Sequence, residues 1–160
     1  MEFMLWAVRS LHLFSVVVWL GGTMYQAVVI FPVAKDAQHE FGKDTLHLLQ
    51  GFLPFVWMCV WTVLLTGVAL MLFNPRFIFF DYNDRWSIIL GLKQLVFLLM
   101  VFFSFGYARM LASLNRLLID EGQKQPPGQA VGPYYSRMLQ FSRTNISLGI
   151  IAILLTAALK

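Results

Sequence analysis

The sequence predicts an all-α integral membrane protein, folded as a bundle of four transmembrane helices. Of its 160 residues, 59% are hydrophobic and 12% are charged. Soluble domains are roughly half apolar and about a quarter charged, and one domain of this length cannot hide so many apolar side chains in a single core. The composition therefore excludes a disordered chain, a disulfide-stabilised scaffold and an ordinary cytosolic enzyme.

Four apolar stretches give the order of the helices: residues 3–33, 48–73, 86–118 and 138–159. Each has the roughly 20 residues that a helix needs to cross the apolar part of a bilayer. Backbone groups in lipid must be paired within the segment, so each stretch is expected to be helical. We expect residues 1–160 to form one membrane domain, whose third helix is long enough to project beyond the bilayer.

Three polar connectors separate the helices. Residues 34–50 combine charges with scattered apolar side chains, and are expected to continue as a helix along the membrane surface. Residues 74–84 open with an Asn-Pro turn signal and contain aromatic side chains suited to the membrane interface. Residues 120–133 contain paired prolines and three glycines, which predict a flexible loop without regular structure.

The positions of lysine and arginine predict the orientation. Seven lie on the side of the first and third connectors and four on the side of the termini, with Lys93 left out because it lies within a helix. The seven are Lys35, Lys43, Arg109, Arg116, Lys124, Arg137 and Arg143, and the four are Arg9, Arg76, Arg85 and Lys160. Basic residues accumulate on the cytoplasmic side. We therefore expect both termini outside, in the periplasm if this is a bacterial inner-membrane protein, and no removable signal peptide.

Ionisable residues inside transmembrane helices are costly and mark functional candidates. His12 lies about nine residues into the first helix, roughly 13 Å deep, and Lys93 lies about seven residues into the third, roughly 10 Å deep. Arg9 precedes His12 by three residues, on the same face. These three residues are expected to meet at one level in the outer leaflet, with two positive charges and no acid inside the span.

Three interpretations of this cluster remain open. Arg9 and Lys93 could extend to the membrane surface while His12 bonds a neighbouring helix. His12 could instead be an axial ligand of a b-type haem or a related tetrapyrrole, with the cations neutralising propionates. A copper site is the third, with His12 joined by a soft sulfur ligand such as Met71. Two positive charges repel a metal cation and attract carboxylates, which favours the macrocycle over copper.

Further polar residues lie near the inner side. Arg143 and Asn145 open the fourth helix and are expected to provide polar partners for a cofactor or an anionic headgroup, whereas anchoring by basic residues is the alternative. Polar residues of the first connector could bind a divalent metal or could be the solvated face of a surface helix. They are Asp36, His39, Glu40, Asp44 and His47.

Other classes of function find little support in the sequence. The basic residues are scattered between apolar runs, so the net charge of +4 does not indicate a nucleic-acid partner. No serine or threonine of a span adjoins a His–carboxylate pair, so hydrolysis is not expected. Cys59 is the single cysteine and can form no internal disulfide. Gly21, Gly22 and Gly67 are expected at close helix contacts.

Four segments together resemble a known family. Residues 11–25, 64–71, 85–96 and 142–155 are similar, in this order, to the four helices of the copper-resistance D-type membrane proteins and of the related J-type protoporphyrinogen oxidases. The residues that carry the resemblance are His12, Trp19, Gly21, Gly22, Thr66, Gly67, Trp86, Lys93, Arg143 and Asn145. The resemblance implies a four-helix bundle that handles haem, porphyrin or copper. The chain departs from the oxidases at Ile146, where they have Glu, and at His39, which lies later than their second His.

These observations lead to one functional expectation and two alternatives. The expected function is binding of b-type haem or a related tetrapyrrole near the outer leaflet, for electron transfer or porphyrin oxidation with a quinone or a partner subunit as acceptor. A b-type haem usually takes two axial ligands, so the second would come from Met, Lys93, water or another chain of a homo-oligomer. The alternatives are copper transport or resistance, and a cofactor-free accessory subunit of a larger membrane complex.

Overall fold

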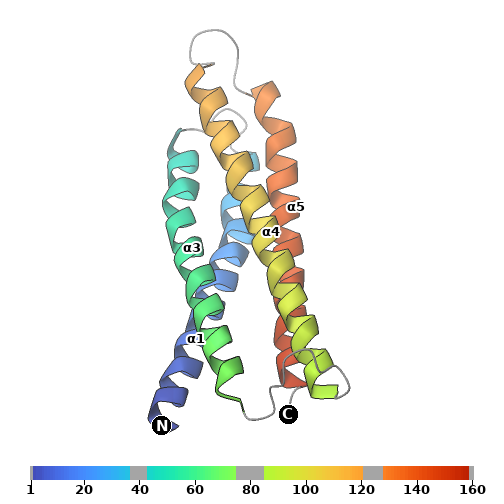
Figure 1. Cartoon of the computed structure of the whole chain (residues 1–160). Coiled ribbons are helices and arrows are strands. Elements are labelled where there is room, and N and C mark those ends of the chain that lie inside the picture. The colour runs from blue at the N-terminus through green and yellow to red at the C-terminus, as the bar shows by residue number, and fades with distance from the viewer. Residues whose placement is uncertain (1, 37–42, 75–84, 121–127, 159–160) are drawn as a thin grey trace.

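The computed structural model describes residues 2–36, 43–74, 85–120 and 128–158. Nearly all of these residues are helical, and none of them forms a strand. The elements are α1 (Glu2–Tyr25), the π-helical turn η1 (Gln26–Ile30), α2 (Phe31–Asp36), α3 (Lys43–Leu72), α4 (Arg85–Asp120) and α5 (Gly128–Ala157). Because α1, η1 and α2 follow one another without a break, the described chain forms four long helical segments (Figure 1).

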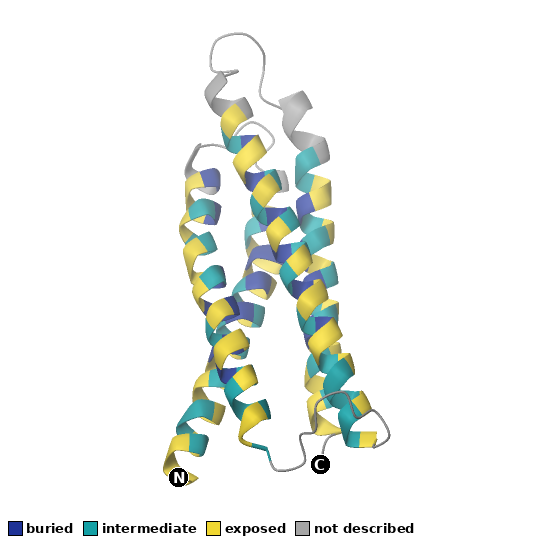
Figure 2. Cartoon of the chain, in the orientation of Figure 1, coloured by how far each residue is buried: buried dark blue, intermediate teal, exposed yellow. Residues whose placement is uncertain are grey.

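Four segments are long and apolar enough to cross a membrane, namely Glu2–Val33, Leu46–Leu72, Arg85–Arg116 and Tyr134–Ala157. Exposed residues cover the outward faces of these helices (Figure 2), and large apolar side chains such as Trp6 are among them. Apolar surface of this extent is stable against lipid rather than against water. The chain is therefore an all-α four-helix membrane bundle, as the sequence predicts.

The helices associate as two pairs. α1 packs mainly on α3 and α4 mainly on α5, while contacts between α1 and α5 join the pairs. Neighbouring helices along the chain run in opposite directions, so both termini lie at the same end of the bundle (Figure 1). We call this the termini end. It contains the start of α1, the last turns of α3 and the first turns of α4.

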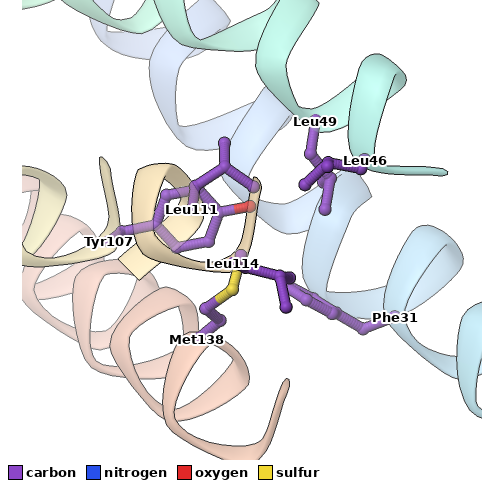
Figure 3. Packing of buried hydrophobic residues seen from close by; sticks show 7 residues of the cluster. All are labelled: Phe31, Leu46, Leu49, Tyr107, Leu111, Leu114 and Met138. Atoms are coloured by element: carbon purple, nitrogen blue, oxygen red, sulfur yellow. The ribbon is translucent and has the colours of Figure 1, made fainter. Parts of the chain in front are cut away.

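Two clusters of buried side chains form the core. The cluster far from the termini end joins all the long helices (Figure 3) and consists of Phe31, Leu46, Leu49, Tyr107, Leu111, Leu114 and Met138. The second cluster lies nearer the middle of the bundle and consists of Trp19, Val56, Cys59, Val60, Val96 and Met100. Buried apolar contacts therefore continue along most of the bundle, with polar side chains between them at a few levels.

Two predictions for the connectors need correction. The loop expected at residues 120–133 is shorter, because α5 already begins at Gly128 and continues through Pro133. Met138 of α5 is fully buried in the cluster that contains Leu111 and Leu114 of α4. Tyr134 and Tyr135 pack against the same cluster, so the helix is held in the bundle from residue 134 onward, after the glycines and prolines of weak helix propensity.

The first connector also differs from its prediction of a separate surface helix. Residues 34–36 belong to α2, and residues 43–50 are the first turns of α3, continuous with the membrane span. Leu46 and Leu49 are buried in this part of α3, so the helix packs into the bundle instead of lying on a surface. His39 and Glu40, and the interfacial stretch 75–84, lie outside the described residues.

Two glycines allow close helix contacts. A Cβ atom at Gly22 would lie 1.8 Å from Cζ of Phe52, and one at Gly149 would lie 2.1 Å from Cδ2 of Leu20. The prediction of a close contact is thus confirmed for Gly22. It is wrong for Gly21 within this chain, because a Cβ there meets nothing within 4 Å. Gly149 brings α5 against α1, a contact that the sequence did not single out.

Candidate functional site

A hydrogen bond between His12 and Thr66 joins α1 to α3 near the termini end. Nδ1 of His12 lies 2.8 Å from Oγ1 of Thr66. The same hydroxyl donates to carbonyls of its own helix, those of Thr62 and, at 3.3 Å, Val63. A hydroxyl has one proton and accepts through its lone pairs. We therefore assign the proton between the two side chains to Nδ1 of His12, so that Nε2 of the neutral imidazole keeps its lone pair.

Lys93 lies on α4, a helix that makes few direct contacts with α1. Its positive charge acts on the imidazole of His12, and both side chains are half-buried. Gly67 leaves space beside the ring, since a Cβ there would lie 3.4 Å from Cε1 of His12. His12 and Lys93 are thus both half-buried near the termini end of the bundle, and their direct contact stays a prediction.

Met71 lies one turn beyond Gly67 on α3, and its sulfur is in a polar contact. Nε2 of Gln94 donates a hydrogen bond to Sδ of Met71 at 3.1 Å. Gln94 follows Lys93 directly on α4. The predicted sulfur ligand therefore belongs to the same end of the bundle as His12, and it is held by a residue next to the lysine.

The other predicted residues are not part of the contact between His12 and Thr66. Arg9 is exposed on α1, one turn nearer the N-terminus, and Arg143 is exposed on α5. Asn145 is buried and donates from Nδ2 to Oγ of Ser104 at 2.7 Å. Ser104 follows Lys93 by eleven residues on α4, which is roughly 16 Å along the helix axis. Asn145 therefore belongs to a different level of the bundle from the His12 site.

Sequence reasoning missed the partners that orient the site. Thr66 was singled out only by the family resemblance and not as the partner of His12, and Gln94 was not singled out at all. Each is nevertheless a polar side chain within an apolar span, the same signal that singled out His12. Which of the polar residues on α3 faces α1 depends on the rotation of α3 about its axis. That rotation is set by the packing of the whole helix and is not readable from one segment.

The surface metal site considered for the first connector falls largely outside the described residues, because His39 and Glu40 are not described. Among the residues that the structure describes, no three His, Cys, Asp or Glu side chains gather to hold a metal ion. His47 is exposed on α3, and Cys59 is a free, buried thiol in the core. The candidate site of the described chain therefore consists of His12 with Thr66 and Lys93, flanked by Met71.

Comparison with known proteins adds no relative on which these residues could be aligned. The resemblance of the four segments to the copper-resistance proteins and porphyrin oxidases stays a prediction, and the assignment of the site depends on its own geometry. The chain matches no protein-family model, no curated protein and no solved structure.

Proposed function

We propose that this membrane protein binds a b-type haem or a related tetrapyrrole through Nε2 of His12 and serves in electron transfer. One observation carries the proposal: Nδ1 of His12 lies 2.8 Å from Oγ1 of Thr66, whose own proton is donated to the carbonyl of Thr62, so we assign the shared proton to Nδ1. Histidines that bind metals commonly donate their other ring N–H to an acceptor, which fixes the tautomer and the ring orientation. His12 is held in this way, with the lone pair of Nε2 available to iron.

The charges near His12 support an anionic ligand. Lys93 acts electrostatically on the imidazole, and Arg9 is one turn away on the same helix. Haem propionates are carboxylates, which form strong charge-assisted hydrogen bonds with lysine and arginine. A bound haem supplies a one-electron redox centre whose potential depends on its axial ligands. Met71, Lys93, a water molecule or a second copy of the chain would provide the second axial ligand.

The excess of basic residues on the side of the first and third connectors supports an orientation with both termini outside. In a bacterial inner membrane the His12 site then lies in the outer leaflet, facing the periplasm. A quinone in the bilayer or a partner subunit would exchange electrons with the haem. A porphyrin-oxidising activity is the enzymatic form of the same proposal.

Copper is the alternative that Met71 favours. A thioether and an imidazole on one end of the bundle are ligands that suit Cu(I). This would make the chain a copper transport or resistance protein, in line with its resemblance to the copper-resistance D-type membrane proteins. The charge of Lys93 beside His12 opposes the approach of a cation, so we rank copper below the tetrapyrrole.

The test is an absorption spectrum with elemental analysis of protein purified from haem-replete cells. We expect a Soret band with stoichiometric iron, lost in His12→Ala and retained in the control His47→Ala, which removes an exposed histidine. No Soret band, or one that survives His12→Ala, would refute the proposal. Stoichiometric copper that depends on His12 and Met71 would establish the copper alternative. Absence of both, with larger subunits co-purifying, would point to an accessory subunit.

A further inference from the structure

A cavity of about 20 Å³ lies between all four long helices at the level of Asn145. It is lined partly by the aromatic rings of Trp19, Phe52 and Phe141. Its polar lining comes from α1, η1, α4 and α5 and consists of Thr23, Gln26, Ser104, Tyr107, Ser142 and Asn145. Thr23 follows His12 by eleven residues, roughly 16 Å along α1, so the cavity is separate from the His12 site.

Three buried polar atoms of this lining lack a hydrogen-bond partner among the described residues: the Tyr107 hydroxyl, Oγ of Ser142 and Oδ1 of Asn145. Their side chains are 8%, 3% and 5% exposed, respectively. Figure 3 shows the Tyr107 ring within the core, with its hydroxyl oxygen directed inward. Buried polar atoms are nearly always paired, because each unsatisfied one is destabilising. Because all three residues line the same cavity, we read their unpaired atoms as sites for a bound partner.

The chemistry of the three atoms defines that partner. The hydroxyls of Tyr107 and Ser142 can each donate a proton. Oδ1 of Asn145 can only accept, since the amide nitrogen of the same side chain donates to Ser104. A water molecule accepts the two donors with its lone pairs and donates to the amide oxygen, which satisfies all three atoms. One water proton remains for a further acceptor such as the side-chain carbonyl of the buried Gln26.

Other ligands fit less well. No carboxylate is part of the lining, so a cation would lack a counter-charge, and Oδ1 of Asn145 would repel an anion. A carbonyl group could accept from the two hydroxyls but would leave Oδ1 of Asn145 without a donor. A water needs at least about 10–15 Å³ of such space, so the volume of about 20 Å³ suits one water and excludes a ring or an acyl chain.

We propose that the cavity is a binding site for one ordered water molecule, which bridges α4 and α5 through Tyr107, Ser142 and Asn145. The site lies beside the π-helical turn η1, which begins with Gln26 at the cavity. Turns of this kind occur frequently at functional sites. The bridging water belongs to the structure in the same sense as a buried side chain, and it links polar groups that lipid cannot solvate.

Removal of single hydroxyl groups tests the proposal. In Tyr107→Phe and Ser142→Ala, the water loses a donor, so we expect each variant to lower the Tm in detergent by about 2–4 °C. The double variant should lose less than the sum, because both hydroxyls bind the same water. The matched controls Tyr25→Phe and Ser147→Ala, at exposed positions, should leave the Tm unchanged. If the cavity is dry, removal of an unsatisfied hydroxyl relieves a cost. An unchanged or higher Tm in both cavity variants would therefore overturn the proposal.

A second measurement does not depend on stability. X-ray radiolysis generates hydroxyl radicals from ordered waters, and mass spectrometry locates the side chains that they oxidise. We expect oxidation of Tyr107 in the folded protein, with little at Phe31, which is 0% exposed and does not line the cavity. In Ser142→Val, which fills the cavity, oxidation of Tyr107 should fall several-fold. Oxidation of Tyr107 no faster than that of Phe31, or unaffected by Ser142→Val, would overturn the proposal.

Discussion

The contact between α1 and α3 at Gly22 gives the sharpest test of the packing. In Gly22→Ala, the new Cβ would lie 1.8 Å from Cζ of Phe52. Carbon atoms in contact lie ~3.5 Å or more apart, so the ring must withdraw by about 1.7 Å. Phe52 packs against the cluster around Trp19 and lines the polar cavity, so its displacement disturbs both. Overpacking of this kind costs about 1–3 kcal/mol.

The neighbouring glycine provides the matched control. Gly21→Ala adds the same methyl group one residue earlier on α1, where it meets nothing within 4 Å. Alanine is favoured over glycine inside a helix by about 0.5–1 kcal/mol, and this gain is common to both variants. The difference between Gly21→Ala and Gly22→Ala therefore isolates the packing cost, and we expect Gly22→Ala to be less stable by about 1–3 kcal/mol.

The assay is reversible unfolding in mixed micelles, followed by circular dichroism with increasing denaturing detergent. Equal free energies of unfolding for the two variants would refute the close contact at Gly22. A compensating change makes the test specific: Phe52→Leu shortens the opposing side chain. In the Gly22→Ala background it should recover part of the lost stability, whereas in the Gly21→Ala background it should only lower stability.

Three further predictions concern the His12 site and the contact of α5 with α1. Thr66→Val removes the acceptor for Nδ1 of His12, so it should weaken retention of a bound cofactor about 10–100-fold. The control Thr62→Val, one turn earlier on α3, should leave retention unchanged, and equal cofactor affinity of the two variants in titrations would contradict the role of Thr66. Lys93→Gln should weaken binding of a haem more than that of a haem with esterified propionates, and an equal loss for both would exclude a charge pair. Gly149→Ala should lower the free energy of unfolding by about 1–3 kcal/mol, because its Cβ would lie 2.1 Å from Leu20. A free energy of unfolding equal to that of Gly21→Ala would show that Leu20 moves aside without cost.

The fold could be predicted from the sequence because a chain segment in lipid must pair its own backbone groups, which makes each span a helix. A stretch of about 20 apolar residues must satisfy its own backbone, so helix positions follow from hydropathy. The same regularity gives the depths of His12 and Lys93 within their helices, since a rise of 1.5 Å per residue converts position into depth. The start of α5 at Gly128 was not readable, because glycine and proline in residues 128–133 have weak helix propensity and predict a loop there.

The partners of the polar residues were not predictable for a related reason. Hydropathy gives the depth of a side chain but not the direction in which it points. The bond from His12 to Thr66 requires a particular rotation of α3, and the bond from Asn145 to Ser104 requires a particular register between α5 and α4. Both quantities are set by side-chain packing between helices, which includes the close contacts at Gly22 and Gly149.

The pairing of α1 with α3 and of α4 with α5 has a consequence for biosynthesis. Each pair is consecutive in the chain, so its two spans leave the ribosome one after the other and can associate as a helical hairpin before the next pair is made. Contacts between partners close in sequence form quickly, since little chain entropy is lost in bringing them together. The hairpin of α1 and α3 can thus form in the bilayer before α4 and α5 are made. Packing of α5 on α1 then joins the two hairpins into the bundle. Two halves made from separate messages, divided between α3 and α4, should accordingly find each other in the membrane.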